Sequence, residues 1–213
     1  MSEVLEKLKR AVIDGMDDDA AAVTKEALQQ GIAPLQIVND GIVAGIRESG
    51  RLWKENKFFL PDVIMSAEAF TAAMKLVEPL MKSESQVGKV VMGTVAGDMH
   101  SLGKAIVIAM LRGAGFEVVD LGVDVPAAAF VDAAAGQKPD ILGLGCYMST
   151  TMAEMSAIIT ALKAKGLRDG VKVLIGGVPT SQAFADEVGA DAWGLDAMDA
   201  VNKALALVGK GVA

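Results

Sequence analysis

Apolar side chains recur at helical spacing from the start of the chain to about residue 82. Leu5, Leu8 and Val12 share one helical face, and Gly15 ends that pattern. Asp17 stands where it would cap the next helix. The predicted helices span residues 5–12, 20–30, 35–50 and 61–82. This part of the chain is therefore expected to form a helical bundle.

The last of these helices, which opens at Pro61, is apolar almost all round. One side carries Val63, Ala67, Phe70, Met74, Val77 and Met81. The opposite side carries Met65, Ala69, Ala72, Leu76 and Leu80. Such a helix is either the central helix of the bundle, buried on both sides, or it covers something apolar outside the bundle.

After residue 88 the pattern changes to short buried runs that alternate with helical stretches. The predicted strands span residues 89–95, 116–121, 141–145, 171–175 and 190–193. The predicted helices span residues 103–113, 126–136, 151–165, 180–188 and 197–208. This alternation predicts a parallel sheet covered on both faces, either with the flavodoxin-like order 2-1-3-4-5 or as a Rossmann variant.

The change of pattern divides the chain into a helical domain and a doubly wound, Rossmann-like α/β domain. The expected domains are residues 1–84 and 89–213, with the polar stretch at about residues 83–88 as a linker. In a doubly wound sheet, ligands bind beyond the carboxyl ends of the strands, where the strand order reverses. The loops after Val95 and Gly145 are therefore the ones expected to hold a site.

Charge and composition narrow the class of protein. The net charge is −7 and no basic run occurs, which argues against a nucleic-acid-binding surface. No uncharged apolar stretch approaches the roughly 18 residues of a membrane span. Cys146 is the single cysteine and has no partner for an internal disulfide. The first residues do not resemble a signal peptide, so a cytoplasmic location is expected.

The loop after the first predicted strand holds the single histidine of the chain, His100. Asp98, two residues earlier, is placed to accept a hydrogen bond from the imidazole Nδ1–H, which leaves Nε2 free to bind a metal or take a proton. Gly103 lets the backbone come close to a bulky ligand where the next helix opens.

Several kinds of site compete for this loop. A phosphate loop fails, because five residues separate Gly97 from Gly103 and Ala105 stands where a hydroxyl residue is needed. A zinc site would have no further histidine and only one cysteine to complete its ligand set. A Cys–His dyad with Cys146 stays open as a rival, and so does a structural histidine.

The pattern Asp98-x-His100-x-x-Gly103 resembles the signature of cobalamin-binding domains in methionine synthase, B12-dependent mutases and corrinoid proteins. The pair Gly176-Gly177 matches the glycine pair of that family, and a helical domain precedes the sheet in both. The size and layout are most similar to the small corrinoid proteins of three-component methyltransferase systems. These systems serve methylamines, glycine betaine, methanol or methoxylated aromatics.

The resemblance implies that cobalamin binds with its own base displaced and His100 as the lower ligand of cobalt. Asp98 would hold the imidazole in one tautomer and tune its basicity. A hydroxyl often continues this relay in the family, and Thr151 or Ser149 aligns with that position. Helix capping is the alternative role for these hydroxyls.

The resemblance also implies a deep slot for the displaced nucleotide tail. Cofactor contacts are expected from Met99, Ser101, Leu102, Gly103, Gly145, Cys146, Tyr147, Gly176, Gly177, Trp193 and Gly194. The chain departs from the family at Gly145, which stands where the family has the serine of a Ser-x-Leu motif. A hydroxyl contact to the tail is therefore expected to be missing, and Cys146 is expected to be a small buried residue.

The upper face of the corrinoid would be covered by the helical cap domain. Phe58, Phe59, Leu60 and Met65 are the residues expected to lie there, with Trp53 as a further candidate. Burial of these apolar residues inside the helical domain would explain them equally well, without any cofactor. The cap would have to move, with the linker as its hinge.

The implied function is that of a methyl carrier, which supplies the corrinoid cofactor and no substrate site of its own. Its partners would be a substrate:corrinoid methyltransferase and a methylcorrinoid:acceptor methyltransferase using tetrahydrofolate or a thiol, with a reductive activator as a further partner. Neither nucleic acid nor membrane is expected. The alternatives are the cobalamin-binding subunit of a mutase, a B12-sensing binding module and a Cys–His hydrolase or transferase.

Overall fold

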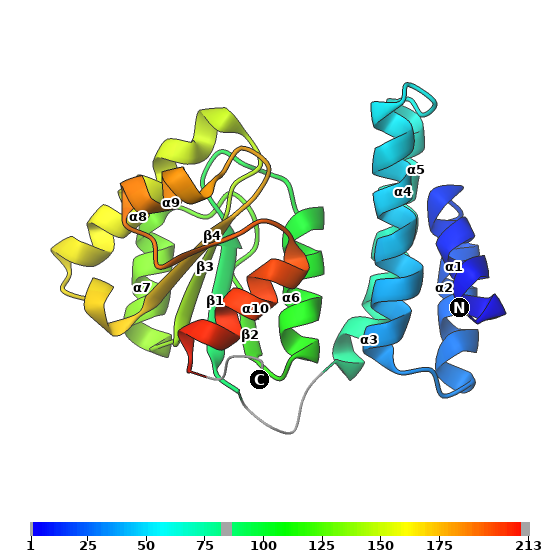
Figure 1. Cartoon of the computed structure of the whole chain (residues 1–213), viewed down its shortest axis with the longest axis horizontal. Helices are drawn as coiled ribbons and strands as arrows, with labels where there is room; N and C mark the ends of the chain where they lie inside the picture. The colour runs from blue at the N-terminus through cyan, green and yellow to red at the C-terminus, as the bar shows by residue number, and fades with distance from the viewer. Residues whose placement is uncertain (1, 82–86, 210–213) are drawn as a thin grey trace. The chain divides into compact units, whose positions relative to one another are not determined.

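The computed structural model describes residues 2–81 and 87–209, and the chain divides into two compact units, residues 1–82 and 83–213. We call them the helical unit and the sheet unit (Figure 1). The predicted linker at about residues 83–88 lies mostly outside the described residues. Of that segment only Val87 and Gly88 are described, and the Val87 N–H donates to the Gly115 carbonyl at 2.9 Å. Val87 is thereby hydrogen-bonded within the sheet unit.

The helical unit confirms the predicted run of helices. Its elements are α1 (Glu3–Ile13), α2 (Asp17–Gln29), α3 (Pro34–Gln36), the π-helix η1 (Ile37–Val43), α4 (Ala44–Lys54), α5 (Leu60–Val77) and the 3-10 turn η2 (Glu78–Leu80). One local prediction was wrong: Met16 is the N-cap of α2, and Asp17 is its first helical residue. Asp17 is thus one of three acidic residues in the first turn, where carboxylates favour the helix dipole.

Small residues allow the helices of this unit to approach closely. A Cβ atom on Gly41 would lie 2.7 Å from the Leu8 side chain, and one on Gly45 would lie 2.7 Å from that of Val12. The spacing of Gly41 and Gly45, four residues apart, puts both on the helical face that meets α1. These glycines explain how the segment formed by η1 and α4 packs against α1.

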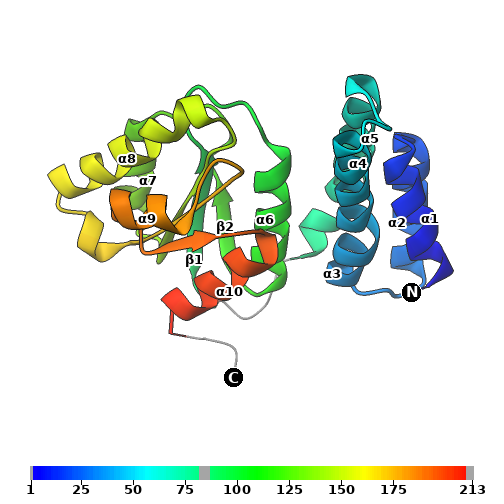
Figure 2. The ribbon, with the colours of Figure 1, turned by 45° about the horizontal axis from the view of Figure 1, so that its top comes forward.

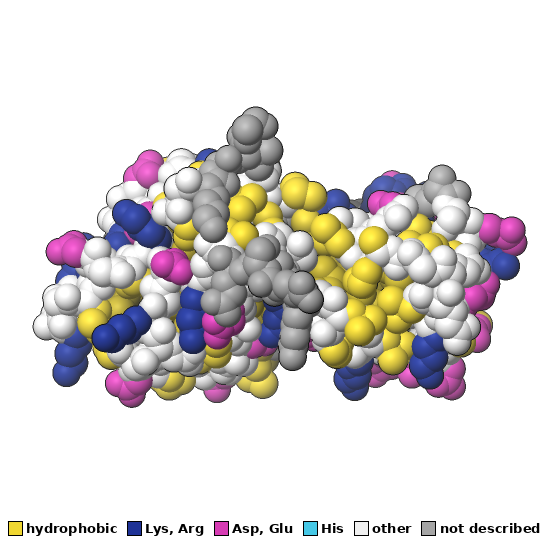
Figure 3. All heavy atoms as spheres, turned by 90° about the horizontal axis from the view of Figure 1, so that it is seen from below, with side chains coloured by type: hydrophobic (Ala, Val, Ile, Leu, Met, Phe, Trp, Pro, Cys, Tyr) yellow, Lys and Arg dark blue, Asp and Glu magenta, His cyan; other side chains and the backbone are white. Residues whose placement is uncertain are grey.

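One side of α5 is buried and the other reaches the surface. Ser66, Ala69, Phe70, Ala73, Met74 and Val77 are buried. Leu60, Ile64 and Met65 are exposed by 59%, 50% and 47%. Figure 3, with the helical unit at the right as in Figure 1, shows apolar side chains gathered on a face of this unit. The sequence allowed α5 to be a central helix buried on both sides within its own bundle. The exposed residues show that this interpretation is wrong.

The sheet unit contains five parallel strands in the order β2-β1-β3-β4-β5, which confirms the predicted flavodoxin-like order. The strands are β1 (Lys89–Thr94), β2 (Glu117–Asp120), β3 (Ile141–Gly145), β4 (Lys172–Gly176) and β5 (Ala192–Gly194). The helices are α6 (Leu102–Gly113), α7 (Ala127–Gln137), α8 (Met152–Ala164), α9 (Gln182–Val188) and α10 (Ala197–Leu207), with 3-10 turns at η3 (Ser149–Thr151) and η4 (Arg168–Gly170).

Alternate residues of each strand face opposite helical layers. Val90, Met92 and Leu174 pack with α6 and α10, whereas Val91 and Leu144 pack with α7, α8 and α9. Figure 2 shows these two layers on either side of the sheet. Because β1 lies between β2 and β3, the strand order reverses between β1 and β3, and the loops after these strands flank that point.

In the part of the chain that the structure describes, no helix is both long and apolar enough to cross a membrane.

Candidate functional site

The loop after β1 is held by hydrogen bonds to two segments, the loop after β2 and the end of β1. Gly97 has a φ of +76°, a conformation that favours glycine, and its N–H donates to Asp124 Oδ1 at 2.7 Å. The Asp124 N–H donates in turn to the Asp98 carbonyl at 3.0 Å. Thr94, the last residue of β1, donates its hydroxyl to the His100 carbonyl at 3.0 Å. These hydrogen bonds hold the main chain on both sides of His100 in place, independently of the imidazole itself.

Asp98 and His100 form the predicted pair. The carboxylate of Asp98 is fully buried, whereas the His100 side chain is 59% exposed. Asp98 Oδ1 accepts the His100 backbone N–H at 3.0 Å and lies 2.7 Å from His100 Nδ1. An ionised carboxylate is an acceptor only, so the proton of the neutral imidazole belongs on Nδ1. Nε2 is then left with its lone pair, and no atom of the described residues hydrogen-bonds to it.

Three hydrogen bonds keep Asp98 ionised. Burial by itself raises the pKa of a carboxyl group, and it opposes ionisation here. Hydrogen bonds from the Tyr147 N–H, the His100 N–H and the imidazole outweigh that effect and hold the pKa of Asp98 below its ordinary value. The site thus combines a buried, ionised carboxylate with a partly exposed imidazole.

The hydroxyls proposed to extend this relay do not reach Asp98. The Thr151 hydroxyl donates to the Met148 carbonyl at 3.0 Å and lies 3.3 Å from Cys146 Sγ. Ser149 is exposed at the start of η3. The second oxygen of Asp98 instead accepts the backbone N–H of Tyr147 at 2.6 Å. A main-chain donor from the loop after β3 occupies the place that the sequence suggested for a hydroxyl.

Cys146 is a buried thiol, as expected for a small packed residue. Its exposure is 0%, and its Sγ lies 3.1 Å from the Met148 carbonyl. His100 is hydrogen-bonded to Asp98 and not to this thiol. The geometry gives no support to a Cys–His dyad. The exposure of His100 likewise argues against a packed structural histidine.

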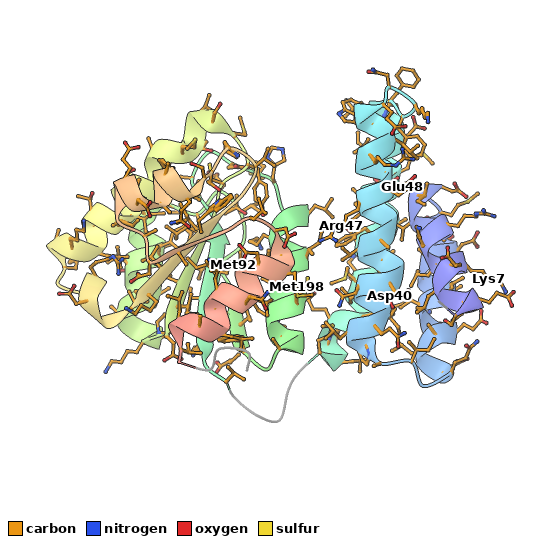
Figure 4. All side chains as sticks on the ribbon, viewed as in Figure 1. Lys7, Asp40, Arg47, Glu48, Met92 and Met198 are labelled. Atoms are coloured by element: carbon orange, nitrogen blue, oxygen red, sulfur yellow. The ribbon has the colours of Figure 1, made fainter. Side chains whose placement is uncertain are left out.

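Glycines from three neighbouring strands lie side by side at the carboxyl end of the sheet. Gly145 pairs with Gly176, and Gly176 pairs with Gly194. All three share the face of Met92, which packs with α6 and α10. Figure 4 labels Met92 on the sheet. We call this row of Gly145, Gly176 and Gly194 the glycine trough, because no side chain rises from the sheet along it.

Gly177, the second glycine of the predicted pair, has a different role. Its φ is +123°, and a Cβ atom there would lie 1.8 Å from the Cys146 carbonyl oxygen. Only glycine fits such a close approach between the turns after β3 and β4. The two glycines therefore have different roles. Gly176 lines the trough, and Gly177 allows the backbones of two turns to come into contact.

Trp193 lies on the other face of the sheet from the trough, where it packs against the core that α7, α8 and α9 cover. Its Nε1–H donates to the Thr180 hydroxyl at 2.9 Å, and that hydroxyl donates to the Gly177 carbonyl at 2.6 Å. The indole thus braces the turn after β4. The sequence suggested that Trp193 contacts the cofactor beside Gly194, but the indole does not line the trough.

The first turn of α6 contributes its backbone to the site more than its side chains. Ser101 is the N-cap of α6 and is exposed, and Leu102 is half-buried. Gly103 makes room for a ring: a Cβ atom there would lie 2.5 Å from Tyr147 Cε1. The Tyr147 ring centroid lies 5.9 Å from that of His100. Gly103, Tyr147 and His100, which the sequence suggested separately as cofactor contacts or ligand, therefore lie close together.

Exposed apolar residues surround this edge of the sheet, and most of them were missed in the sequence. In the described part of the sheet unit, the exposed large hydrophobic residues are Met99, Met148, Val178, Leu195 and Met198. They follow β1, β3, β4 and β5, with Met198 in the first turn of α10 (Figure 4). Only Met99 was predicted. We call these five residues the apolar rim, and such a rim suits a large, flat, partly apolar ligand.

The residues predicted to cover the ligand lie in the helical unit. Phe59 is exposed by 69% and Trp53 by 46%. Phe58 and Met65 are neighbours, since both line a hollow with Ile13, Asp14 and Asp62. The Phe59 N–H donates to Asp62 Oδ2 at 2.7 Å, which fixes the start of α5. These side chains thus include a surface-exposed apolar set at one end of α5.

The site fits a metal that arrives already held by another ligand set. No group of three or more His, Cys, Asp or Glu side chains able to hold a metal occurs among residues 2–81 and 87–209. A single imidazole nitrogen can still complete the coordination of a metal in a macrocycle. The glycine trough supplies a cradle that Cβ atoms would fill, and the apolar rim surrounds it. The residues present therefore fit a corrinoid.

Comparison with known proteins agrees with this fit. Residues 88–202 and residues 4–78 each match a model described as a B12 binding domain. A corrinoid protein of Desulfitobacterium hafniense is 44% identical over 97% of this chain and 98% of its own length.

Two solved structures are also similar. The monomethylamine corrinoid protein of Methanosarcina barkeri has a TM-score of 0.83 and 32% identity, over 96% of this chain and 98% of that one. The methanol:cobalamin methyltransferase complex MtaBC from Methanosarcina barkeri has a TM-score of 0.56 and 31% identity, over 98% of this chain and 80% of that one.

Proposed function

Because this chain belongs to the family of B12-binding corrinoid proteins of methyltransferase systems, we propose that it is a methyl carrier that serves two separate methyltransferases. The observation that carries the proposal is the exposed imidazole of His100, oriented by buried Asp98 beside the glycine trough. When bound, the corrinoid supplies a cobalt centre that accepts and releases a methyl group.

The roles of the protein groups follow from their contacts. His100 Nε2 would bind the lower face of the cobalt, since Nδ1 is engaged by Asp98. Asp98 would hold the proton on Nδ1 and fix the orientation of the ring. The Tyr147 N–H, bound to the other carboxylate oxygen at 2.6 Å, would keep Asp98 ionised and in place. These groups position the metal ligand, and none of them acts on the methyl donor.

The glycine trough would receive the nucleotide tail of the corrinoid. Gly145 and Gly176 leave room along the sheet face toward α6 and α10, and Gly194 ends the row where Ala200 of α10 packs against it. The apolar rim would contact the macrocycle. Of the predicted contacts, Met99, Gly103, Gly145, Tyr147, Gly176 and Gly194 lie on this side and are retained in the proposal, while Ser101 and Leu102 contribute the opening turn of α6.

The helical unit would shield the upper face of the corrinoid from water. Phe59, Leu60 and Met65 are exposed apolar residues at the start of α5 and would serve this purpose, together with Phe58, which lines a hollow with Met65. Transfer of the methyl group would require the unit to move away. Trp53, also exposed, is a further candidate for this surface.

The partners would be a substrate:corrinoid methyltransferase and a second methyltransferase that passes the methyl group to tetrahydrofolate or a thiol. The two similar solved structures are those of a monomethylamine corrinoid protein and of a methanol:cobalamin methyltransferase complex. Methylamines and methanol are therefore the first donors to test. A reductive activator would restore the cofactor after accidental oxidation.

Reconstitution tests the proposal. The purified protein is incubated with hydroxocobalamin, freed of unbound ligand and examined by its visible spectrum. We expect a bound corrinoid whose spectrum changes in H100A, which removes the proposed ligand, and is unchanged in D132A, an exposed substitution on α7. Wild-type protein that retains no corrinoid under oxidising or reducing conditions would overturn the proposal.

A further inference from the structure

The ring of Tyr147 occupies one end of the glycine trough. A Cβ atom on Gly145 would lie 3.4 Å from Tyr147 Cε2, and one on Gly103 would lie 2.5 Å from Cε1 and 2.7 Å from the hydroxyl oxygen. One edge of the ring thus faces the end of β3 and the other faces the first turn of α6. The ring stands between two backbones at the point where the strand order reverses.

The backbone and the side chain of Tyr147 are held very differently. The N–H donates to Asp98 Oδ2 at 2.6 Å, so the main chain is fixed to a buried carboxylate. Among the described residues no atom hydrogen-bonds to the phenol hydroxyl, and no buried side-chain polar atom lacks a partner. The hydroxyl therefore keeps some contact with solvent, although the side chain as a whole is half-buried. Rotation of the ring about χ1 would cost packing contacts and no hydrogen bond within the protein.

The other two glycines of the trough meet no large side chain. A Cβ atom on Gly176 would meet only the Gly194 carbonyl at 3.4 Å, whereas one on Gly194 would lie 2.9 Å from Ala200 Cβ and 3.1 Å from Ala200 Cα, so α10 packs closely on that end of the trough. Tyr147 is thus the large side chain at the end nearest His100. A tail that runs from a macrocycle on His100 into the trough would first meet this ring.

We propose that Tyr147 is a side-chain gate, which must rotate off Gly103 and Gly145 before the nucleotide tail of a corrinoid can enter the glycine trough. The inference rests on the proposed function. It makes Tyr147 a specificity-determining residue, because the ring opposes corrinoids that carry a tail and leaves tail-less ones unaffected. Gly145, which lacks a side chain, gives the ring its place against β3.

The test compares association rates of two ligands measured by stopped-flow absorbance. Cobinamide has no tail, and p-cresolylcobamide has a tail whose phenolic ring cannot bind cobalt, so no ligand-side base has to dissociate first. For Y147A we expect p-cresolylcobamide to associate about tenfold faster than with wild type, which corresponds to about 1.4 kcal/mol of packing removed from the barrier. Cobinamide should change by less than about twofold.

Two further variants separate the ring from its hydroxyl and guard against misfolding. Y147F keeps the ring and should bind p-cresolylcobamide as slowly as wild type. Y147L removes the ring but keeps a branched side chain, and it should act in the same direction as Y147A. Far-UV circular dichroism establishes that each variant is folded, and Y147L replaces Y147A if the latter is not.

The outcomes are distinct. Equal rates of p-cresolylcobamide binding in wild type and Y147A, or an equal acceleration of both ligands, would overturn the gate and leave the proposed function intact. A rate in Y147F as high as in Y147A would also overturn it, since the ring would not be the obstacle. Wild-type protein that binds neither ligand would overturn the proposed function itself.

Discussion

At the scale of single residues, Asp98 organises the site. One buried carboxylate accepts hydrogen bonds from the imidazole of His100, from the His100 backbone and from the Tyr147 backbone. It therefore joins the loop after β1 to the loop after β3. Charge-assisted hydrogen bonds of this kind are the strong ones, which is why the buried charge is tolerated.

The protonation of Tyr147 should report its surroundings. Burial, followed by the negative charge of Asp98, raises the pKa of the phenol above its ordinary value of about 10. The native protein thus holds this proton to higher pH than the unfolded chain does. The stability that this group contributes is complete below about pH 10 and is lost as the pH rises through the folded-state pKa.

Tyr147 is the one tyrosine in the sequence, so phenolate absorbance during an alkaline titration reports it alone. We expect a midpoint above 10 in the native protein and an ordinary one in denaturant. The free energy of unfolding should also fall more steeply above pH 10 in wild type than in Y147F. A native midpoint at the ordinary value would show that the ring is not packed as described.

Some residues of the site could be predicted from the sequence and others could not. The spacing of Asp98 and His100 indicated their hydrogen bond, because a side chain two residues away can reach an imidazole. The relay through Thr151 was not found, since its hydroxyl is satisfied locally by the Met148 carbonyl. The donor in its place is the Tyr147 backbone, and a main-chain N–H leaves no mark in a sequence.

At the scale of elements, an ion pair joins the start of α6 to the end of β2. Lys104 Nζ contacts both carboxylate oxygens of Asp120, and Asp120 also accepts the Gly122 N–H at 2.8 Å. The Lys104 side chain is 4% exposed, whereas that of Asp120 is 37% exposed. The two partners therefore stand in unequal environments, although they form one pair.

The two neutralising substitutions should have unequal costs. D120N leaves a buried ammonium without a counter-charge, and we expect it to lower the free energy of unfolding by about 3 kcal/mol. K104M leaves a carboxylate that water can reach, and we expect a loss of about 1 kcal/mol or less. Urea unfolding of the sheet unit can be followed by Trp193 fluorescence in a W53F background, since the chain has two tryptophans. A larger loss in K104M than in D120N would contradict this account.

The elements themselves were largely predictable. Buried runs such as Ile141–Gly145 matched β3 residue for residue, because β-strands buried on both faces are continuously apolar. The glycine trough was not predictable as a row. Gly145, Gly176 and Gly194 were each noted, but their alignment depends on strand register, which parallel crossovers do not encode locally. The apolar rim was missed for a related reason, since isolated apolar residues in loops have no periodicity.

At the scale of the whole molecule, strand order explains why the site lies where it does. The order β2-β1-β3-β4-β5 makes the loops after β1 and β3 neighbours, although Asp98 and Tyr147 are far apart in the sequence. The alternation of strands and helices predicted a doubly wound parallel sheet, with this order as one of two alternatives. The helical unit supplies a second apolar surface on α5, whose exposed residues a bundle alone does not require.

The central claim is that the imidazole of His100 binds the cobalt of a corrinoid. His100 is the one histidine in the sequence, so ¹⁵N-histidine labels this side chain alone. The labelled and unlabelled proteins are loaded with hydroxocobalamin, reduced to Co(II) and compared by electron paramagnetic resonance. The account predicts that nitrogen splitting of the cobalt lines changes from triplets in the unlabelled protein to doublets in the labelled one. Triplets in both samples, or no nitrogen splitting in either, would contradict it.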